Sequence, residues 1–149
     1  METIVKPTMT VLSKKVKCTM AELMQQTHFV KEMYNEAAKL DLHVTGCSYW
    51  VYTGCNGDMN APFDLEFLLP VQANGKKSDI FEIKKVKEYK CVTYLHQGSW
   101  MEFHQVYTNL MKKIQEKGQK IGKSNREMYL NCDFEDGKNC LTEIQIEIE

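Results

Sequence analysis

The sequence predicts an α+β fold in which one β-α-β-β unit is used twice. Two helix starts indicate the duplication: Thr19 and Ser99 lie 80 positions apart, and a glutamate follows each of them three residues later, as in a capping box. Each half ends in a strand-like run of acidic and apolar residues, around Glu66 in the first half and Glu143 in the second. These two glutamates lie 77 positions apart. We therefore expect a pseudo-twofold molecule with an antiparallel sheet, two helices on one face, and a ligand cleft at the seam between the repeats.

The first repeat is expected at about residues 3–72. Pro7 interrupts its extended arm and first strand. The helix that starts at Met20 ends near Asp41, because apolar side chains recur on one stripe between them. A turn signal at Asn56-Gly57-Asp58 separates the next two strands. The strands of this repeat are predicted at residues 4–17, 46–52 and 63–71.

The second repeat is expected at about residues 79–149, after a polar junction. Gly98 ends its first strand, and the helix that starts at Trp100 ends at Gly118. Asp136-Gly137 predicts a hairpin turn before the last strand. The two repeats account for the chain, so we expect a single domain over residues 1–149. Strands are predicted at residues 91–96, 126–132 and 141–148, with residues 81–86 leading into the first of them.

Composition and charge exclude several classes of function. The chain has 149 residues, of which 43% are hydrophobic and 26% charged, as in ordinary globular proteins. A formal net charge of −1 gives no support to direct binding of nucleic acid or of an anionic membrane. No apolar run approaches the length of a membrane span, and no signal segment begins the chain, so we expect a cytoplasmic protein.

Sequence patterns that hold a cofactor are absent. The chain has no GxGxxG, no P-loop and no GxSxG, so neither a nucleotide nor a serine nucleophile is indicated. Its histidines lack the spacing of metal ligands. We therefore expect no cofactor and no metal.

Six cysteines occur without any CxxC pair, and we expect them to be reduced thiols with small buried side chains. Cys47 and Cys55 are separated by the same eight positions as Cys132 and Cys140, and each pair falls where a hairpin brings two strands together. A hairpin disulfide or a shared metal is the alternative for these two pairs.

The second half resembles a known family in three blocks that occur in the same order and spacing. These blocks are Tyr-Leu-His-Gln-Gly at 94–98, Asn-Arg-Glu-Met-Tyr-Leu at 125–130 and Thr-Glu-Ile-Gln-Ile at 142–146. They resemble the GyrI-like family of bacterial effector-binding domains, which occur in transcription activators and as stand-alone proteins. The first half matches more loosely. The resemblance implies a duplicated, SHS2-like β-α-β-β repeat with an aromatic-lined cleft at the pseudo-twofold axis.

The resemblance also implies a set of ligand-binding residues. In family members that bind cationic drugs, a glutamate in the strand after the second helix lies at the bottom of the cleft, and Glu127 occupies that position here. Tyr129 points the same way because side chains alternate along a strand. The offset of 77 makes Trp50 the counterpart of Glu127, so Trp50 and Tyr52 are expected to face Glu127 and Tyr129 across the seam. At the start of the second helix, Trp100 stands where many members carry a tyrosine, and Phe103 matches a pocket aromatic of the family. The full set is Glu127, Tyr129, Trp50, Tyr52, Trp100 and Phe103.

This set fits a cation site physically. A carboxylate among aromatic rings is poorly hydrated, so its pKa rises, and a lipophilic cation compensates its charge without directional hydrogen bonds. Aromatic faces add cation–π attraction. The alternative interpretation is that Glu127 faces solvent and pairs with Arg126 or a lysine, while the aromatic side chains belong to the core.

Three functions follow as hypotheses. The first is a small-molecule binding protein without its own DNA-binding domain, which sequesters or senses hydrophobic or cationic aromatic toxins. The second is a hydrolase of strained cyclopropane-type toxins, with Glu127 as general base and Tyr129 or Tyr52 assisting. The third is an inhibitor of a protein partner such as a gyrase-like target or a regulator, for which no surface is marked. The first two use the same residues, so the sequence leaves open whether the protein is an enzyme.

Overall fold

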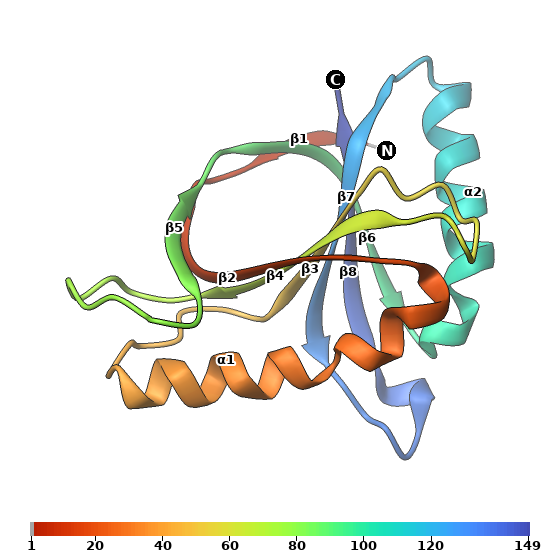
Figure 1. The fold of residues 1–149 in the computed structure, drawn as a ribbon. Helices are drawn as coiled ribbons and strands as arrows, with labels where there is room; N and C mark the ends of the chain where they lie inside the picture. Colours follow the sequence, from red (N-terminus) through yellow and green to blue (C-terminus); the bar gives the residue numbers. More distant parts are fainter. Residues whose placement is uncertain (1) are drawn as a thin grey trace.

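The computed structural model describes residues 2–149 and shows one eight-stranded antiparallel sheet that curls round, with two helices on its outer side (Figure 1). The predicted α+β fold class is confirmed. The same order of elements occurs twice. The first half contains β1 (Thr3–Lys6), β2 (Met9–Cys18), the 3₁₀ helix η1 (Met20–Gln26), α1 (His28–Lys39), β3 (Tyr49–Thr53) and β4 (Phe63–Pro70). The second half contains β5 (Glu82–Val86), β6 (Tyr89–Gln97), η2 (Trp100–Glu102), α2 (Phe103–Glu116), β7 (Ile121–Asn131), η3 (Gly137–Asn139) and β8 (Leu141–Ile148).

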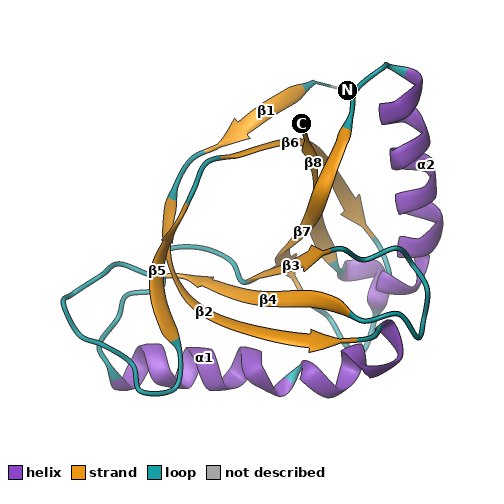
Figure 2. Cartoon of the chain, turned by 45° about the horizontal axis from the view of Figure 1, so that its top comes forward, coloured by secondary structure: helices purple, strands orange, loops and turns teal. Residues whose placement is uncertain are grey.

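The strands follow the order β1-β6-β8-β7-β3-β4-β2-β5. The two halves therefore meet at β3 and β7 in the middle of the sheet, where Trp50 lies directly opposite Glu127. The halves also meet at the ends of the sheet. Thr3 pairs with Val92 and Met9 pairs with Val86, so one antiparallel register continues from the β1–β6 ladder into the β2–β5 ladder. Figure 2 shows the curl that these two contacts produce.

The outer face of the sheet carries the apolar core beneath the helices. Side chains that alternate along β2 and β4, such as Leu12 and Phe67, pack with Met33 of α1. A second cluster joins Ile114 of α2 to Ile144 of β8. Because successive strand residues point to opposite faces, the side chains between these positions line the inner face of the curl.

The inner face carries several paired polar and charged side chains. Lys84 and the Ser13 hydroxyl both contact the Glu66 carboxylate, and Lys6 lies 2.7 Å from Glu143. Arg126 stacks its guanidinium on the Tyr89 ring, 3.7 Å from the ring centroid. Arg126 and Glu127 are neighbours on β7 and so point to opposite faces of the sheet, which overturns the interpretation that they pair with each other.

Both long helices begin with a 3₁₀ segment that was not predicted. The helix expected from Met20 starts as η1 and becomes α-helical only at His28, and η2 precedes α2 in the same way. At the first start the predicted capping contact forms, because the Thr19 amide donates to the Glu22 carboxylate at 3.0 Å. At the second start Ser99 accepts a hydrogen bond from the Met101 amide, but the Glu102 carboxylate lies 3.1 Å from Nε2 of His96 instead.

Two predicted boundaries in the last hairpin are wrong. The strand expected from Arg126 already starts at Ile121, and it contains an irregularity between Ile121 and Asn125. A side chain at Gly122 would meet the Glu147 side chain at 2.6 Å, so a larger residue there would force that side chain to shift. The hairpin turn expected at Asp136 is instead the N-terminal cap of η3, within a longer loop.

The six cysteines of the chain are free thiols in this structure, including Cys47, Cys55, Cys132 and Cys140. Among residues 2–149, no helix combines the length and the apolar character that crossing a membrane requires.

Candidate functional site

The middle of the sheet brings together side chains from β3, β7 and α2 on the outer face. Trp50 and Glu127 are paired directly across the seam, as the offset of 77 predicts. In the ladder Tyr52 pairs with Asn125, because two residues forward on β3 correspond to two residues back on β7 in antiparallel strands. The side chains of Tyr52 and Tyr129 nevertheless face one another, since both hydroxyls donate to Oε2 of Glu127.

The Glu127 carboxylate accepts hydrogen bonds from three tyrosine hydroxyls. Tyr52 donates to Oε2 at 3.1 Å, and Tyr107 donates to Oε1 at 2.9 Å. The Tyr129 hydroxyl makes a short hydrogen bond to Oε2. Glu127 is only 5% exposed, so the interpretation of this residue as a solvent-facing side chain is also wrong.

Burial governs the protonation of this cluster. Desolvation raises the pKa of Glu127 above its usual value, while the hydrogen bonds from Tyr129, Tyr107 and Tyr52 act in the opposite direction. Burial and the nearby carboxylate raise the pKa of all three tyrosines well above the usual value. The phenols therefore keep their protons and remain donors to Glu127.

Aromatic rings surround the cluster in edge-on arrangements. Tyr129 lies between Trp50 and Trp100, with ring centroids 5.8 and 5.9 Å away, respectively. Phe103 lies 6.0 Å from Tyr107 and 5.5 Å from His96. Trp100 and Phe103 thus reach Glu127 only through an intervening tyrosine, whereas Tyr52 and Tyr129 contact it directly.

The sequence interpretation missed Tyr107, which binds one oxygen of Glu127, and Asn125, whose amide nitrogen donates to the Tyr107 hydroxyl at 2.9 Å. Tyr107 follows Phe103 by four positions on the stripe of α2 that faces the sheet. That spacing was an available signal, but it does not distinguish a core tyrosine from one that binds a carboxylate.

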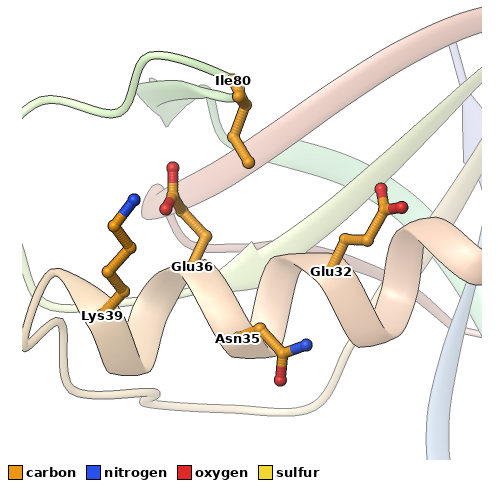
Figure 3. A pocket seen from close by; sticks show the side chains of 5 residues that line it. All are labelled: Glu32, Asn35, Glu36, Lys39 and Ile80. Carbon is orange, nitrogen blue, oxygen red and sulfur yellow. The ribbon is translucent and has the colours of Figure 1, made fainter.

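A surface hollow lies away from the seam, on α1 (Figure 3). Glu32, Asn35, Glu36 and Lys39 of α1 line it together with Ile80. The Glu36 carboxylate already accepts a short hydrogen bond from the Ser78 hydroxyl. The lining is mostly charged, and it lacks aromatic rings like those that surround Glu127.

The raised pKa of Glu127 leads to a prediction about stability. A carboxyl group whose pKa is raised by folding contributes stability that is fully present at low pH and is lost as the pH rises through the raised value. Glu127→Gln removes this titration, and it also replaces one acceptor oxygen with an amide donor. We therefore expect the unfolding midpoint of the variant, relative to that of the unsubstituted protein, to rise as the pH is raised from the ordinary carboxyl range to neutral. Circular dichroism melts across this pH range measure it, and a difference between the two midpoints that does not change with pH would contradict the account.

The sheet is duplicated and curled, the helices lie on its outer face, and its centre combines a carboxylate with aromatic rings. The sequence profile of the GyrI-like small molecule binding domain matches residues 1–149. The chain belongs to this family. No curated protein matches the sequence significantly.

Solved structures share the fold over nearly the whole chain. The C-terminal domain of EcmrR is 22% identical, with a TM-score of 0.80 over 99% of this chain and 97% of that domain. SAV2435, solved with bound tetraphenylphosphonium, is 17% identical, with a TM-score of 0.62 over 100% of this chain and 94% of that one. A hydrolase encoded by lin2189 from Listeria innocua is 13% identical, with a TM-score of 0.63 over 99% of this chain and 91% of that one. At these identities the similarity shows a common fold.

Proposed function

We propose that this protein binds lipophilic aromatic cations at the seam, with Glu127 supplying the compensating charge and Trp50, Tyr52, Tyr107, Tyr129, Trp100 and Phe103 supplying aromatic contact. The observation that carries this proposal is the buried carboxylate of Glu127, which neutral phenols surround. An ionised group in such a place gains most from a ligand that carries positive charge and little hydration. The binding of tetraphenylphosphonium by SAV2435, which has the same fold, supports this choice of ligand class.

The hydrogen bonds to Glu127 favour cations without acidic protons. Its carboxylate already accepts from three hydroxyl groups, so most of its acceptor positions are occupied. A quaternary or delocalised cation needs no further acceptor and interacts with the charge and with the ring faces. A primary ammonium ion would have to displace a tyrosine hydroxyl to donate its own hydrogen bond.

Access to the carboxylate requires movement. Glu127 is 5% exposed, but Tyr107, Tyr129, Trp100 and Phe103 are half-buried and together cover it. A ligand that reaches the carboxylate therefore displaces these rings toward solvent. In this proposal the protein captures toxic compounds or reports their presence to a partner.

Charge selectivity tests the proposed function with two ions of nearly the same shape. Tetraphenylphosphonium should quench or shift the fluorescence of Trp50 and Trp100, the two tryptophans of the chain, at concentrations at least about tenfold lower than tetraphenylborate does. Triphenylphosphine oxide serves as the neutral aromatic control. Equal binding of the two ions would show that the site selects apolar shape alone, and the proposed role of Glu127 would then fail.

A hydrolase is the second candidate, favoured by the raised pKa of Glu127 and by the hydrolase from Listeria innocua among the structures with this fold. Glu127 would act as the general base, through an acceptor position that the tyrosines leave free. Tyr129 would orient the carboxylate and not supply a proton, because its own pKa is raised well above the usual value. Turnover of a cyclopropane-bearing substrate, followed by mass spectrometry and abolished in Glu127→Gln, would establish this alternative.

A further inference from the structure

An aromatic side chain is exposed to solvent beside the rings that surround Glu127. Phe134 lies in the loop between β7 and β8 and is 83% exposed. Its ring contacts Trp100 edge-on, with centroids 5.6 Å apart, and Trp100 contacts Tyr129 in the same way at 5.9 Å. Tyr129 in turn donates to Glu127. We call this series of rings, Phe134, Trp100 and Tyr129, the aromatic ladder; it runs from the surface to the buried carboxylate.

The loop holds Phe134 in this exposed position. Oδ1 of Asp133 accepts hydrogen bonds from the amides of Glu135 and Asp136, both at 2.9 Å, and its Oδ2 accepts from the Asn139 side chain at 3.0 Å. A side chain at Gly137 would lie 3.1 Å from Cβ of Ser99, so the loop packs closely on the cap of η2. An exposed phenylalanine on a hydrogen-bonded loop is fixed where it can meet a ligand without an ordering step.

The charge around Phe134 suits a cation. Asp133, Glu135 and Asp136 flank the ring along the chain, and Lys138 is the basic residue of the same loop. The hydrogen bonds that Asp133 accepts from Asn139, Asp136 and Glu135 lower its pKa, so its carboxylate stays ionised. Fixed negative charges beside an exposed ring attract lipophilic cations and act mainly on the rate of association.

We propose that Phe134 and the acidic loop around it form an outer capture surface, from which a lipophilic aromatic cation passes along Trp100 and Tyr129 to Glu127. This inference rests on the proposed function. It adds a residue that acts on the rate of binding and contributes little to final affinity, because Phe134 is 83% exposed and lies outside Trp100, the outermost ring of the proposed site.

Stopped-flow fluorescence with tetraphenylphosphonium tests the capture surface. Phe134→Ala should lower the association and dissociation rate constants by the same factor, about three- to tenfold, and leave the dissociation constant within about twofold. Phe134→Tyr should restore both rates. Ile80→Ala removes another exposed apolar side chain, beside α1 (Figure 3), and should change neither rate.

The charge component is tested separately by Glu135→Gln. This change should reduce the ionic-strength dependence of the association rate for the phosphonium ion and leave the rates for triphenylphosphine oxide unchanged.

The outcomes separate the two proposals. An unchanged association rate in Phe134→Ala, with the unsubstituted protein binding normally, overturns the capture surface and leaves the proposed function intact. A weaker equilibrium affinity caused only by faster dissociation also overturns it, because Phe134 would then belong to the final site. Absence of phosphonium binding by the unsubstituted protein overturns both proposals together.

Discussion

Replacing Glu127 with glutamine should lower the affinity for tetraphenylphosphonium by at least about tenfold, or about 1.4 kcal/mol. The substitution keeps the size of the side chain and one acceptor oxygen, but it replaces the other acceptor with an NH2 donor and removes the charge. In a site that water does not reach, that charge is the main attraction for a cation. The affinity for triphenylphosphine oxide should stay nearly the same, and the preference for phosphonium over tetraphenylborate should disappear. Titration calorimetry with the three ligands measures all of these effects.

Glu36→Gln is the matched control for this experiment. Glu36 is another buried glutamate, 6% exposed, and its carboxylate also accepts a hydrogen bond from a hydroxyl group. It lies on α1, beside the hollow in Figure 3 and away from the seam. Its neutralisation should leave phosphonium binding unchanged. If both variants lose affinity equally, the loss reflects general damage to the fold, and the specific role of Glu127 is contradicted.

The second large effect is expected for Trp100→Ala. This change should lower the affinity for the phosphonium ion and for the neutral phosphine oxide alike, by about tenfold each. The indole ring covers Tyr129 from outside and is fixed by a hydrogen bond from Nε1 to the Thr142 hydroxyl at 3.2 Å. Its removal takes away apolar contact area, which ligands of either charge state use. A loss confined to the cation would show that Trp100 acts through its ring electrostatics and is not a wall of the site.

Trp100→Ala also tests how the covering rings are held. The ring packs on Tyr129 and on exposed Phe134, so its loss should lower the unfolding midpoint as well as the affinity. Trp100→Phe keeps an aromatic ring but loses the hydrogen bond to Thr142. If Trp100→Phe retains the affinity, contact area is the main contribution, and if it does not, the fixed orientation of the ring matters more.

The pairing at the centre of the candidate site could be predicted because it depends on strand register. The offset of 77 between Glu66 and Glu143 is a property of the sequence, and the same offset places Trp50 against Glu127 in the folded sheet. Alternation along β7 then placed Tyr129 on the face of Glu127. These inferences needed no knowledge of how the helices pack.

Tyr107 could not be assigned in this way, because its contact depends on how α2 is rotated and how far it is shifted along the sheet. An apolar stripe shows which face of a helix is buried, but it does not show which strand residue each side chain meets. The beginning of β7 was missed for a related reason. Gly122 weakens the strand signal of the sequence at that point. Its close approach to the Glu147 side chain of the neighbouring strand β8 is a tertiary contact that the sequence does not indicate.

The pairing of Trp50 with Glu127 shows how two similar halves differ where they meet. Under an offset of 77 these two residues occupy equivalent positions, so the axis that relates the halves passes between them. Two identical halves would place a carboxylate opposite a carboxylate there, and mutual repulsion would drive one of them to take up a proton. Tryptophan on one side removes the repulsion and leaves a single negative charge beside an indole ring. The departure from symmetry at this one pair gives the centre of the molecule a charged side and an aromatic side.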